Sequence, residues 1–174
     1  MEYVLTTERL VLRPVTADDH PVLLAHWALP DVCRFLFDGA ALSPAEVTET
    51  IEESTRDFAV NGYGSWIAHE RGRPELAGTE LAGTAGLRPL DAIGLEIYYS
   101  LAPGSWGRGY ATEAARAVID HALGTLGLPE VLAEVDEGNA ASVAVVKRLG
   151  MTPFAVVPGV LGPMTRYRTR RRPS

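Results

Sequence analysis

The chain has 174 residues, a length that corresponds to one domain of ordinary size. With 47% hydrophobic and 22% charged residues it has the proportions of a globular protein that buries a full core. The single cysteine, Cys33, excludes an intramolecular disulfide framework and a thiolate zinc cluster, and it favours a reducing, cytoplasmic compartment. Charged residues, Gly or Pro interrupt every apolar run, and residues 1–12 lack the pattern of a signal peptide, so we expect neither a membrane span nor export.

The net charge is −6, and the five arginines among the last nine residues leave −11 for the rest of the chain. Such an acidic body repels nucleic acid, so we expect no nucleic-acid partner. Residues 170–174 are interpreted as a basic tail that is simply solvated. Contact of this tail with RNA, an anionic membrane surface or an acidic protein is the alternative.

Hydrophobic periodicity and turn residues predict alternating strands and helices. In chain order, we expect a strand over 9–14, a helix over 16–27, a helix over 43–58, strands over 65–70 and 93–101, a helix over 111–126, a strand over 131–135, a helix over 139–149, and strands over 152–157 and 164–169. Pro30 is expected to end the first helix. The sum is a mixed sheet with helices on both faces, in one domain that covers residues 1–174.

The helix over 43–58 has the clearest boundary signals. Ser43 is a good N-cap, Pro44 suits the first helical position, and Glu46 completes a capping box. Gly62 is expected to close the helix. The later helix has a similar start at Asn139 and a left-handed stop at Gly150.

A tandem repeat, Glu-Leu-Ala-Gly-Thr over 75–79 and again over 80–84, follows the strand over 65–70. One copy is expected to begin the next strand and the other to lengthen the hairpin. Because the copies are identical, the sequence does not decide which one pairs. A tolerated duplication at a surface turn is favoured over a binding loop.

The most informative segment is Trp106-Gly-Arg-Gly-Tyr-Ala-Thr-Glu-Ala114, between a strand and a helix. Gly107 and Gly109 lack Cβ, so the backbone can turn sharply and approach a ligand closely. The helix that follows begins with unpaired N–H groups and the positive end of its dipole. Together these features predict a site for a phosphate or pyrophosphate, with an ordinary turn as the alternative.

Two other phosphate-binding motifs fit the same residues poorly. A P-loop requires Gly-Lys-Ser/Thr, whereas Lys147, the only lysine, is followed by Arg148. A dinucleotide fingerprint would use Gly107, Gly109 and Thr112, with Asp136 as the ribose-binding acid. The first glycine, however, lies six residues after the strand, where a dinucleotide-binding turn follows at once. A nucleotide-binding oxidoreductase is therefore the weaker alternative.

A second motif decides between these interpretations: Asn139-Ala-Ala-Ser142 opens a helix that ends in Arg148-Leu-Gly-Met151. Both motifs together resemble the GNAT superfamily of acyl-CoA-dependent N-acetyltransferases, in the branch of the ribosomal-protein-alanine acetyltransferases. In that family Gln/Arg-x-x-Gly-x-Gly/Ala precedes a helix and holds the pyrophosphate of coenzyme A. Here Trp106 replaces Gln or Arg, and Met151 replaces the usual Phe. The resemblance spans about residues 7–167.

This resemblance implies an α/β (α+β) fold with a mixed, mostly antiparallel sheet and a splay between the strands over 93–101 and 131–135. Acetyl-CoA is the implied co-substrate, with its pantetheine in the gap and paired like an added strand. No metal is expected, because the four histidines lack ligand spacing. The implied coenzyme-binding residues are Tyr99, Ser100, Leu101, Trp106, Gly107, Arg108, Gly109, Tyr110, Ala111, Thr112, Asn139 and Ser142.

Acetyl transfer needs a group that takes a proton, because an amine attacks only in its neutral form. Glu96 is the first candidate and Glu134 the second, each with a surface acid as the alternative. Ser142 is implied by the resemblance to protonate the departing sulfur, and its alternative role is a hydroxyl in the first turn of a helix. Many relatives carry a tyrosine acid at the position of Val146, so a tyrosine acid from that helix is absent here.

The implied partners are acetyl-CoA and an amine acceptor, either a protein N-terminus or a small molecule. Tyr98, Tyr99 and Trp66 are candidates for the acceptor pocket, with packing in the core as their alternative. Cys33 has no motif around it that would make it a nucleophile. A homodimer is compatible with the family, and an acyl-CoA-binding module without catalysis is the main alternative function.

Overall fold

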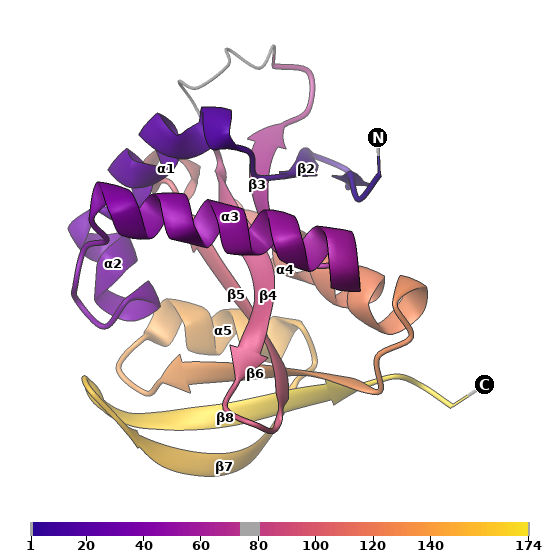
Figure 1. Cartoon of the computed structure of the whole chain (residues 1–174). Coiled ribbons are helices and arrows are strands. Elements are labelled where there is room, and N and C mark those ends of the chain that lie inside the picture. The colour runs from indigo at the N-terminus through magenta and orange to yellow at the C-terminus, as the bar shows by residue number, and fades with distance from the viewer. Residues whose placement is uncertain (1, 74–80, 174) are drawn as a thin grey trace.

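The computed structural model describes residues 2–73 and 81–173, which fold as a mixed α/β domain (Figure 1). The strands are β1 (Leu5–Thr6), β2 (Leu10–Pro14), β3 (Ser65–Glu70), β4 (Gly83–Leu90), β5 (Gly94–Leu101), β6 (Glu130–Asp136), β7 (Thr152–Gly159) and β8 (Gly162–Arg170). The helices are α1 (His20–Trp27), α2 (Pro30–Leu36), α3 (Pro44–Asn61), α4 (Tyr110–Asp120) and α5 (Ala140–Arg148). The expected fold class is confirmed.

All eight strands form one sheet, in the order β1-β2-β3-β4-β5-β6-β8-β7. Neighbouring strands are antiparallel except β5 and β6, which are parallel and pair only at Glu96 and Leu132. Beyond that pair the two strands separate, as the resemblance implied. In Figure 1, β6 and β8 run across the direction of β4. The separation leaves the β6-facing edge of β5 without a strand partner from Ile97 onward.

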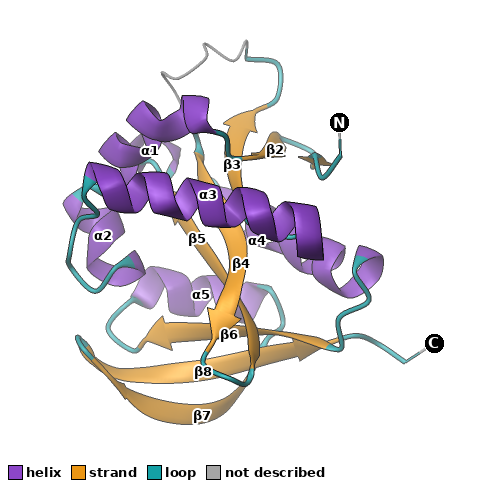
Figure 2. Ribbon diagram, viewed as in Figure 1, coloured by secondary structure: helices purple, strands orange, loops and turns teal. Residues whose placement is uncertain are grey.

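Helices cover both faces of the sheet (Figure 2). One core joins α1, α2 and α3 to the sheet through residues such as Trp27, Val47 and Ile67. The other joins α4 and α5 to the opposite side, with Val118 and Val146 fully buried. The turn before α4 and the start of α5 therefore both lie near the point where β5 and β6 separate.

The boundaries of α3 follow the predicted capping signals. The Ser43 hydroxyl accepts a hydrogen bond from the Glu46 N–H at 3.2 Å, and the Glu46 carboxylate accepts one from the Ser43 N–H at 2.7 Å. Gly62 ends the helix in the left-handed conformation, with φ of 76°. The start of α5 is likewise as predicted, because the Asn139 side chain caps its first turn.

Three sequence-based expectations differ from the structure. Pro30 does not merely follow a helix: it occupies the first turn of α2, where its missing N–H costs nothing, so an additional helix was overlooked. The helix after the glycine turn is regular only to Asp120 and continues to Thr125 as a wider π-type turn. The strand expected to end at residue 169 extends to Arg170, the first residue of the expected tail.

The tandem repeat is described only in part. The first copy and Glu80 lie outside the described residues, whereas Gly83 and Thr84 of the second copy begin β4. A separate finding concerns membranes: among the described helices, none combines the length and the apolar character that a membrane crossing requires.

Candidate functional site

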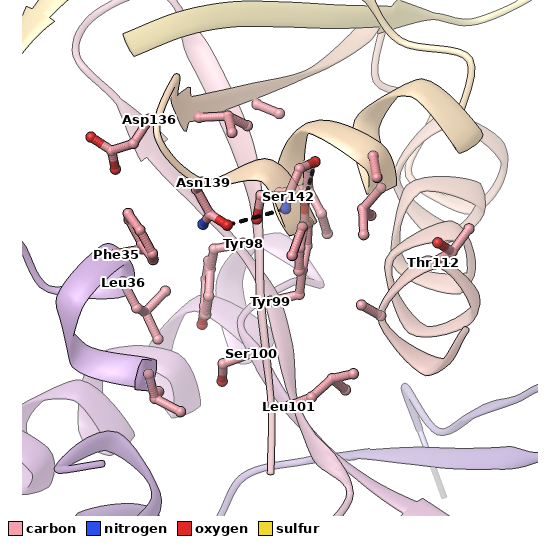
Figure 3. Close-up of a pocket in the computed structure, with 18 of the residues that line it drawn as sticks. Phe35, Leu36, Tyr98, Tyr99, Ser100, Leu101, Thr112, Asp136, Asn139 and Ser142 are labelled. Carbon is pink, nitrogen blue, oxygen red and sulfur yellow. Dashed lines mark hydrogen bonds between the residues drawn. The ribbon is translucent and has the colours of Figure 1, made fainter. Parts of the chain in front are cut away.

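A cavity of about 950 Å³ opens where β5 and β6 separate (Figure 3). Its wall is built from β5, the turn before α4, β6, the first turns of α5, and α2. Most of the site residues expected from the sequence meet here: Glu96, Tyr99, Ser100, Leu101, Trp106, Gly107, Gly109, Ala111, Thr112, Glu134, Asn139 and Ser142 all line it. Segments that are far apart in the chain are therefore brought to one site.

Arg108 and Tyr110 are the two expected site residues that do not line this cavity. Arg108 instead forms an ion pair with Glu70 on β3, and its guanidinium lies 4.5 Å from the centre of the Tyr110 ring. The Tyr110 hydroxyl also donates to Glu70, at 3.2 Å. These side chains hold the turn in place from outside, because they face the sheet and not the cavity.

The turn before α4 has the geometry of an anion site. Gly107 and Gly109 have φ of 71° and 77°, a region that glycine occupies without strain. Gly109 is the N-cap and has no side chain to cover the first-turn N–H groups. The Thr112 hydroxyl oxygen is buried in the first turn of α4, and no described residue forms a hydrogen bond with it. A free hydroxyl, free amides and a helix dipole together suit a phosphate group.

A contact from the turn between β1 and β2 fixes this end of α4, and no pattern in the sequence indicated it. The Glu113 carboxylate accepts hydrogen bonds from the Thr7 hydroxyl at 2.6 Å and from the Arg9 N–H at 2.8 Å. The Arg9 guanidinium binds the same carboxylate at 2.7 Å and donates to the Arg108 carbonyl, also at 2.7 Å. Although burial pushes the pKa of Glu113 upward, these bonds hold it below its usual value.

Trp106 connects this turn to the end of β5. Its indole N–H donates to the Leu101 carbonyl at 3.1 Å, while 48% of the residue stays exposed. The tryptophan that replaces the family's Gln or Arg is therefore positioned at the rim of the cavity, where it ties the strand to the glycine turn.

Glu96 is buried, with only 7% of its surface exposed, so it is not a surface acid. Its Oε1 accepts a hydrogen bond from Arg88 Nε at 2.7 Å. Burial raises the pKa of Glu96 above its usual value, and the charge of Glu134 adds to this effect, against the opposing pull of Arg88 and Arg166. A carboxylate with a raised pKa in a cavity is suited to accept a proton.

Glu134 lies on the adjacent strand and has a different partner. Arg166 on β8 donates to its Oε2 at 2.7 Å and also reaches Asp91 at 2.6 Å. Three of the five C-terminal arginines (Arg166, Arg168 and Arg170) lie in β8. Part of the basic terminus is thus built into the sheet, and one of its residues neutralises an acid of the cavity.

The first turn of α5 forms the opposite wall. Asn139 Oδ1 accepts a hydrogen bond from the Ser142 N–H at 3.2 Å, and the Tyr99 hydroxyl donates to the Ser142 carbonyl at 3.5 Å (Figure 3). Burial raises the pKa of Tyr99, which keeps this hydroxyl protonated. Tyr99 therefore links β5 to α5 across the region where the strands have separated.

The aromatic candidates for the acceptor pocket divide into two groups. Tyr98 lines the cavity, and its hydroxyl is hydrogen-bonded to Ser65. Trp66 is fully buried in the core, and its indole N–H donates to the Tyr3 carbonyl at 2.7 Å. Trp66 is thus a core residue: its ring packs against Phe58 of α3 and against His121, and it does not line the cavity.

Sequence reasoning missed two further parts of the site. His26 on α1 hydrogen-bonds with Ser100 at 2.8 Å, and burial lowers the pKa of His26 to about 4, so its ring is neutral at pH 7. Phe35 and Leu36 line the cavity from α2, the overlooked helix. The signal for α2 was present in Pro30, since proline at a first helical turn begins helices as well as ending them.

Within the residues that the structure describes, no group of three or more His, Cys, Asp and Glu side chains is placed to hold a metal ion. The residues that line the cavity offer carboxylates, hydroxyls, backbone amides, the side-chain amide of Asn139, and the guanidinium groups of Arg88 and Arg148. These groups can bind an anion at one end and accept or donate protons along the wall.

Comparison with known proteins agrees with this geometry. Residues 9–152 match the family model described as "Acetyltransferase (GNAT) domain". The uncharacterized N-acetyltransferase p20 of Bacillus licheniformis is 29% identical over 150 residues, which are 83% of this chain and 80% of that protein. A solved acetyltransferase from Agrobacterium tumefaciens C58 is 28% identical, with a TM-score of 0.81 over 98% of this chain and 95% of that one.

A further solved structure is RimL, the ribosomal L7/L12 α-N-protein acetyltransferase, in complex with coenzyme A. It has a TM-score of 0.78 at 16% identity and covers 96% of this chain and 97% of that one. At this identity the likeness concerns the fold alone.

Proposed function

This chain belongs to the acetyltransferase (GNAT) family and is an acetyltransferase, and we propose that it moves an acetyl group from acetyl-CoA directly to a primary amine in a ternary complex. One observation carries the proposal. A single cavity joins the amide-rich turn at Gly107 and Gly109 to the buried carboxylate of Glu96 and the partly buried carboxylate of Glu134, across the separation of β5 and β6.

Coenzyme A is expected to enter along the line of this separation. Its diphosphate would bind the N–H groups of the turn and the free Thr112 hydroxyl. Its pantetheine would lie beside residues 99–101, because the edge of β5 there has no strand partner among the described residues and can pair with the pantetheine amides. The separation of the strands thus offers a binding edge as well as a channel.

Glu96 is proposed as the general base, because it is buried, lines the cavity and has a raised pKa. As the amine nitrogen bonds to the thioester carbon, a proton passes from the nitrogen to the Glu96 carboxylate, directly or through water. A backbone N–H of β5 beside the separation stabilises the oxyanion. The C–S bond then breaks, and the thiolate takes a proton from Ser142 or water. Glu134 is the second candidate for the base.

The proposal is tested by measuring free thiol released from acetyl-CoA by the purified chain with a panel of primary amines. We expect amine-dependent thiol release and calorimetric binding of coenzyme A. Binding without turnover for any amine would replace the enzyme with an acyl-CoA-binding module. Absence of binding to any acyl-CoA would overturn the proposal altogether.

A further inference from the structure

Asp136, the last residue of β6, is a buried acid that the proposed transfer does not use. Only 7% of its surface is exposed, and its Oδ1 is buried without a hydrogen-bond partner among the described residues. Two other acids that line the cavity, the buried Glu96 and the partly buried Glu134, have arginine partners at 2.7 Å, which are Arg88 and Arg166 respectively. No such cation faces Asp136 within residues 2–73 and 81–173.

An unpaired buried carboxylate is costly, and its surroundings increase the cost. Burial raises the pKa of Asp136, and the negative charges of Asp38 and Glu134 raise it further, whereas a hydrogen bond from its own backbone N–H opposes this rise only in part. Native structures hold very few buried polar atoms without a partner, and those that remain call for an explanation such as a ligand. A positive group brought into the cavity would satisfy Oδ1 and offset the excess negative charge.

The position of Asp136 separates it from the expected coenzyme site. In Figure 3 its carboxylate lies beside Phe35 and Leu36 of α2, on the opposite side from Thr112 of α4. The diphosphate of coenzyme A is itself anionic, so this acidic end of the cavity does not suit it. The unpaired acid is therefore placed to meet the other substrate.

Part of the wall of the cavity is apolar. Phe35 and Leu36 line it from α2, and Ile97 and Val135 line it from the strands. An alkyl chain would pack against such a wall, whereas its charged end would need an acid. A cavity with one acid at the proposed reaction centre, a second acid with an unpartnered oxygen, and an apolar part of its lining fits a molecule with amines at both ends.

We propose that Asp136 is an acceptor-binding residue that holds the second ammonium group of an aliphatic diamine or polyamine while the first amine is acetylated. This inference rests on the proposed function and deepens it. The distal ammonium stays charged and binds the Asp136 carboxylate, whereas the reacting nitrogen is positioned near Glu96. The charge of the distal ammonium group takes no part in the acetyl transfer, yet it determines which class of amine the cavity accepts.

The test compares a series of α,ω-diamines of increasing length with the n-alkylamines of the same length, by thiol release from acetyl-CoA. For the best length we expect kcat/KM of the diamine to exceed that of its monoamine at least about tenfold. In Asp136→Asn this preference should disappear, while kcat/KM of the monoamine stays within about twofold. Equal rates for diamines and monoamines in the unsubstituted protein would overturn the inference, as would an unchanged preference in the variant.

Asp31→Asn is the matched control, because Asp31 is an exposed acid on the same cavity wall. It should keep the diamine preference. Calorimetry supplies a readout that does not need turnover: diamine binding to the protein saturated with coenzyme A should weaken at least about tenfold in Asp136→Asn. Unchanged binding would overturn the inference even if no amine were acetylated. Thiol release with monoamines but without a preference for diamines would contradict only this inference. Absence of turnover with every amine would contradict the proposed function.

Discussion

Arg88 and Glu96 face each other from neighbouring strands, with Arg88 Nε 2.7 Å from Glu96 Oε1. The arginine side chain is 40% exposed, whereas the carboxylate lies inside the cavity wall. Because the ion pair is only half buried, its attraction does not offset the desolvation of the carboxylate, and the pKa of Glu96 is raised. The pair thus keeps a carboxylate in the interior with a raised pKa, which makes it a better proton acceptor than an ordinary glutamate.

Glu96→Gln should abolish most of the acetyl transfer while preserving coenzyme binding. Removing a general base lowers the rate by about 10²- to 10⁴-fold, and the substitution leaves the turn at Gly107 intact. In the unsubstituted protein, the rate should fall as the pH drops through the raised pKa of Glu96, because only the ionised form accepts a proton. Thiol release over a pH series and calorimetry with coenzyme A measure both effects.

Glu134→Gln is the matched control for this base, and it should cost much less activity. The stability of Glu96→Gln adds a second check. A folded-state pKa above the unfolded value means that folding favours the protonated acid, so the stabilisation is present at low pH and lost as the pH rises through the folded pKa. At pH 8 the Gln variant should therefore melt no lower than the parent, and a clear fall in Tm would contradict this account.

Gly109→Ala should weaken coenzyme binding more than it weakens the fold. At φ of 77° a side chain costs about 1 kcal/mol of stability, and the added Cβ lies at the turn that is proposed to hold the diphosphate. We expect the Kd for coenzyme A to rise about tenfold or more. Gly104→Ala is the control, since a Cβ there meets open space and φ is not in the left-handed region. Equal losses of affinity in both variants would argue against an anion site at Gly109.

The features of the fold that were predicted from the sequence depend on interactions between residues that lie close together along the chain. The capping box at Ser43 and the cap at Asn139 involve bonds between residues three apart, so the residue types alone define them. The resemblance to the family additionally predicted the glycine turn before α4 and the separation of β5 from β6. Pro30 shows the limit of a local signal, because a proline ends one helix and begins the next with the same chemistry.

The parts that could not be predicted depend on pairing across the sheet. The contact of Glu113 with Arg9 joins residues 104 positions apart, and no periodicity along the chain encodes it. Asp136 drew attention only as a candidate for a ribose-binding acid, because its missing partner is visible only after β6 and α2 have been placed. The alternation of side chains along β5 predicts which face of the strand carries Glu96, but it does not show whether other elements cover that face.

Glu113→Gln tests whether the contact from the turn between β1 and β2 sets the shape of the glycine turn. The substitution removes the charge that binds Arg9, and through Arg9 it releases the Arg108 carbonyl. Loss of charged hydrogen bonds should lower the free energy of unfolding by about 1–3 kcal/mol and raise the Kd for coenzyme A several-fold. Asp120→Asn, at the exposed opposite end of α4, should change neither quantity appreciably. Unaltered coenzyme affinity in Glu113→Gln would mean that the turn keeps its shape without the contact.

His26 should make the protein less stable in mild acid. Its ring is 4% exposed and hydrogen-bonds with Ser100, which in turn bonds to Thr84 at 2.8 Å. Because burial lowers its pKa from 6.5 to about 4, protonation favours the unfolded chain; the stabilisation is complete above pH 6.5 and is lost as the pH falls through 4. Linkage gives a loss of about 2 kcal/mol between pH 7 and pH 5.

Denaturant unfolding at the two pH values measures this loss, and His26→Gln should remove most of it because glutamine does not titrate. His20→Gln is the control, since that ring lies at the surface against the Pro44 carbonyl. Because Ser100 lines the cavity, the same protonation is expected to disturb the wall of β5 that is proposed to hold pantetheine. Coenzyme affinity should therefore weaken between pH 7 and pH 5 in the parent protein and less so in His26→Gln, and an identical decline in both would assign the pH sensitivity to another group.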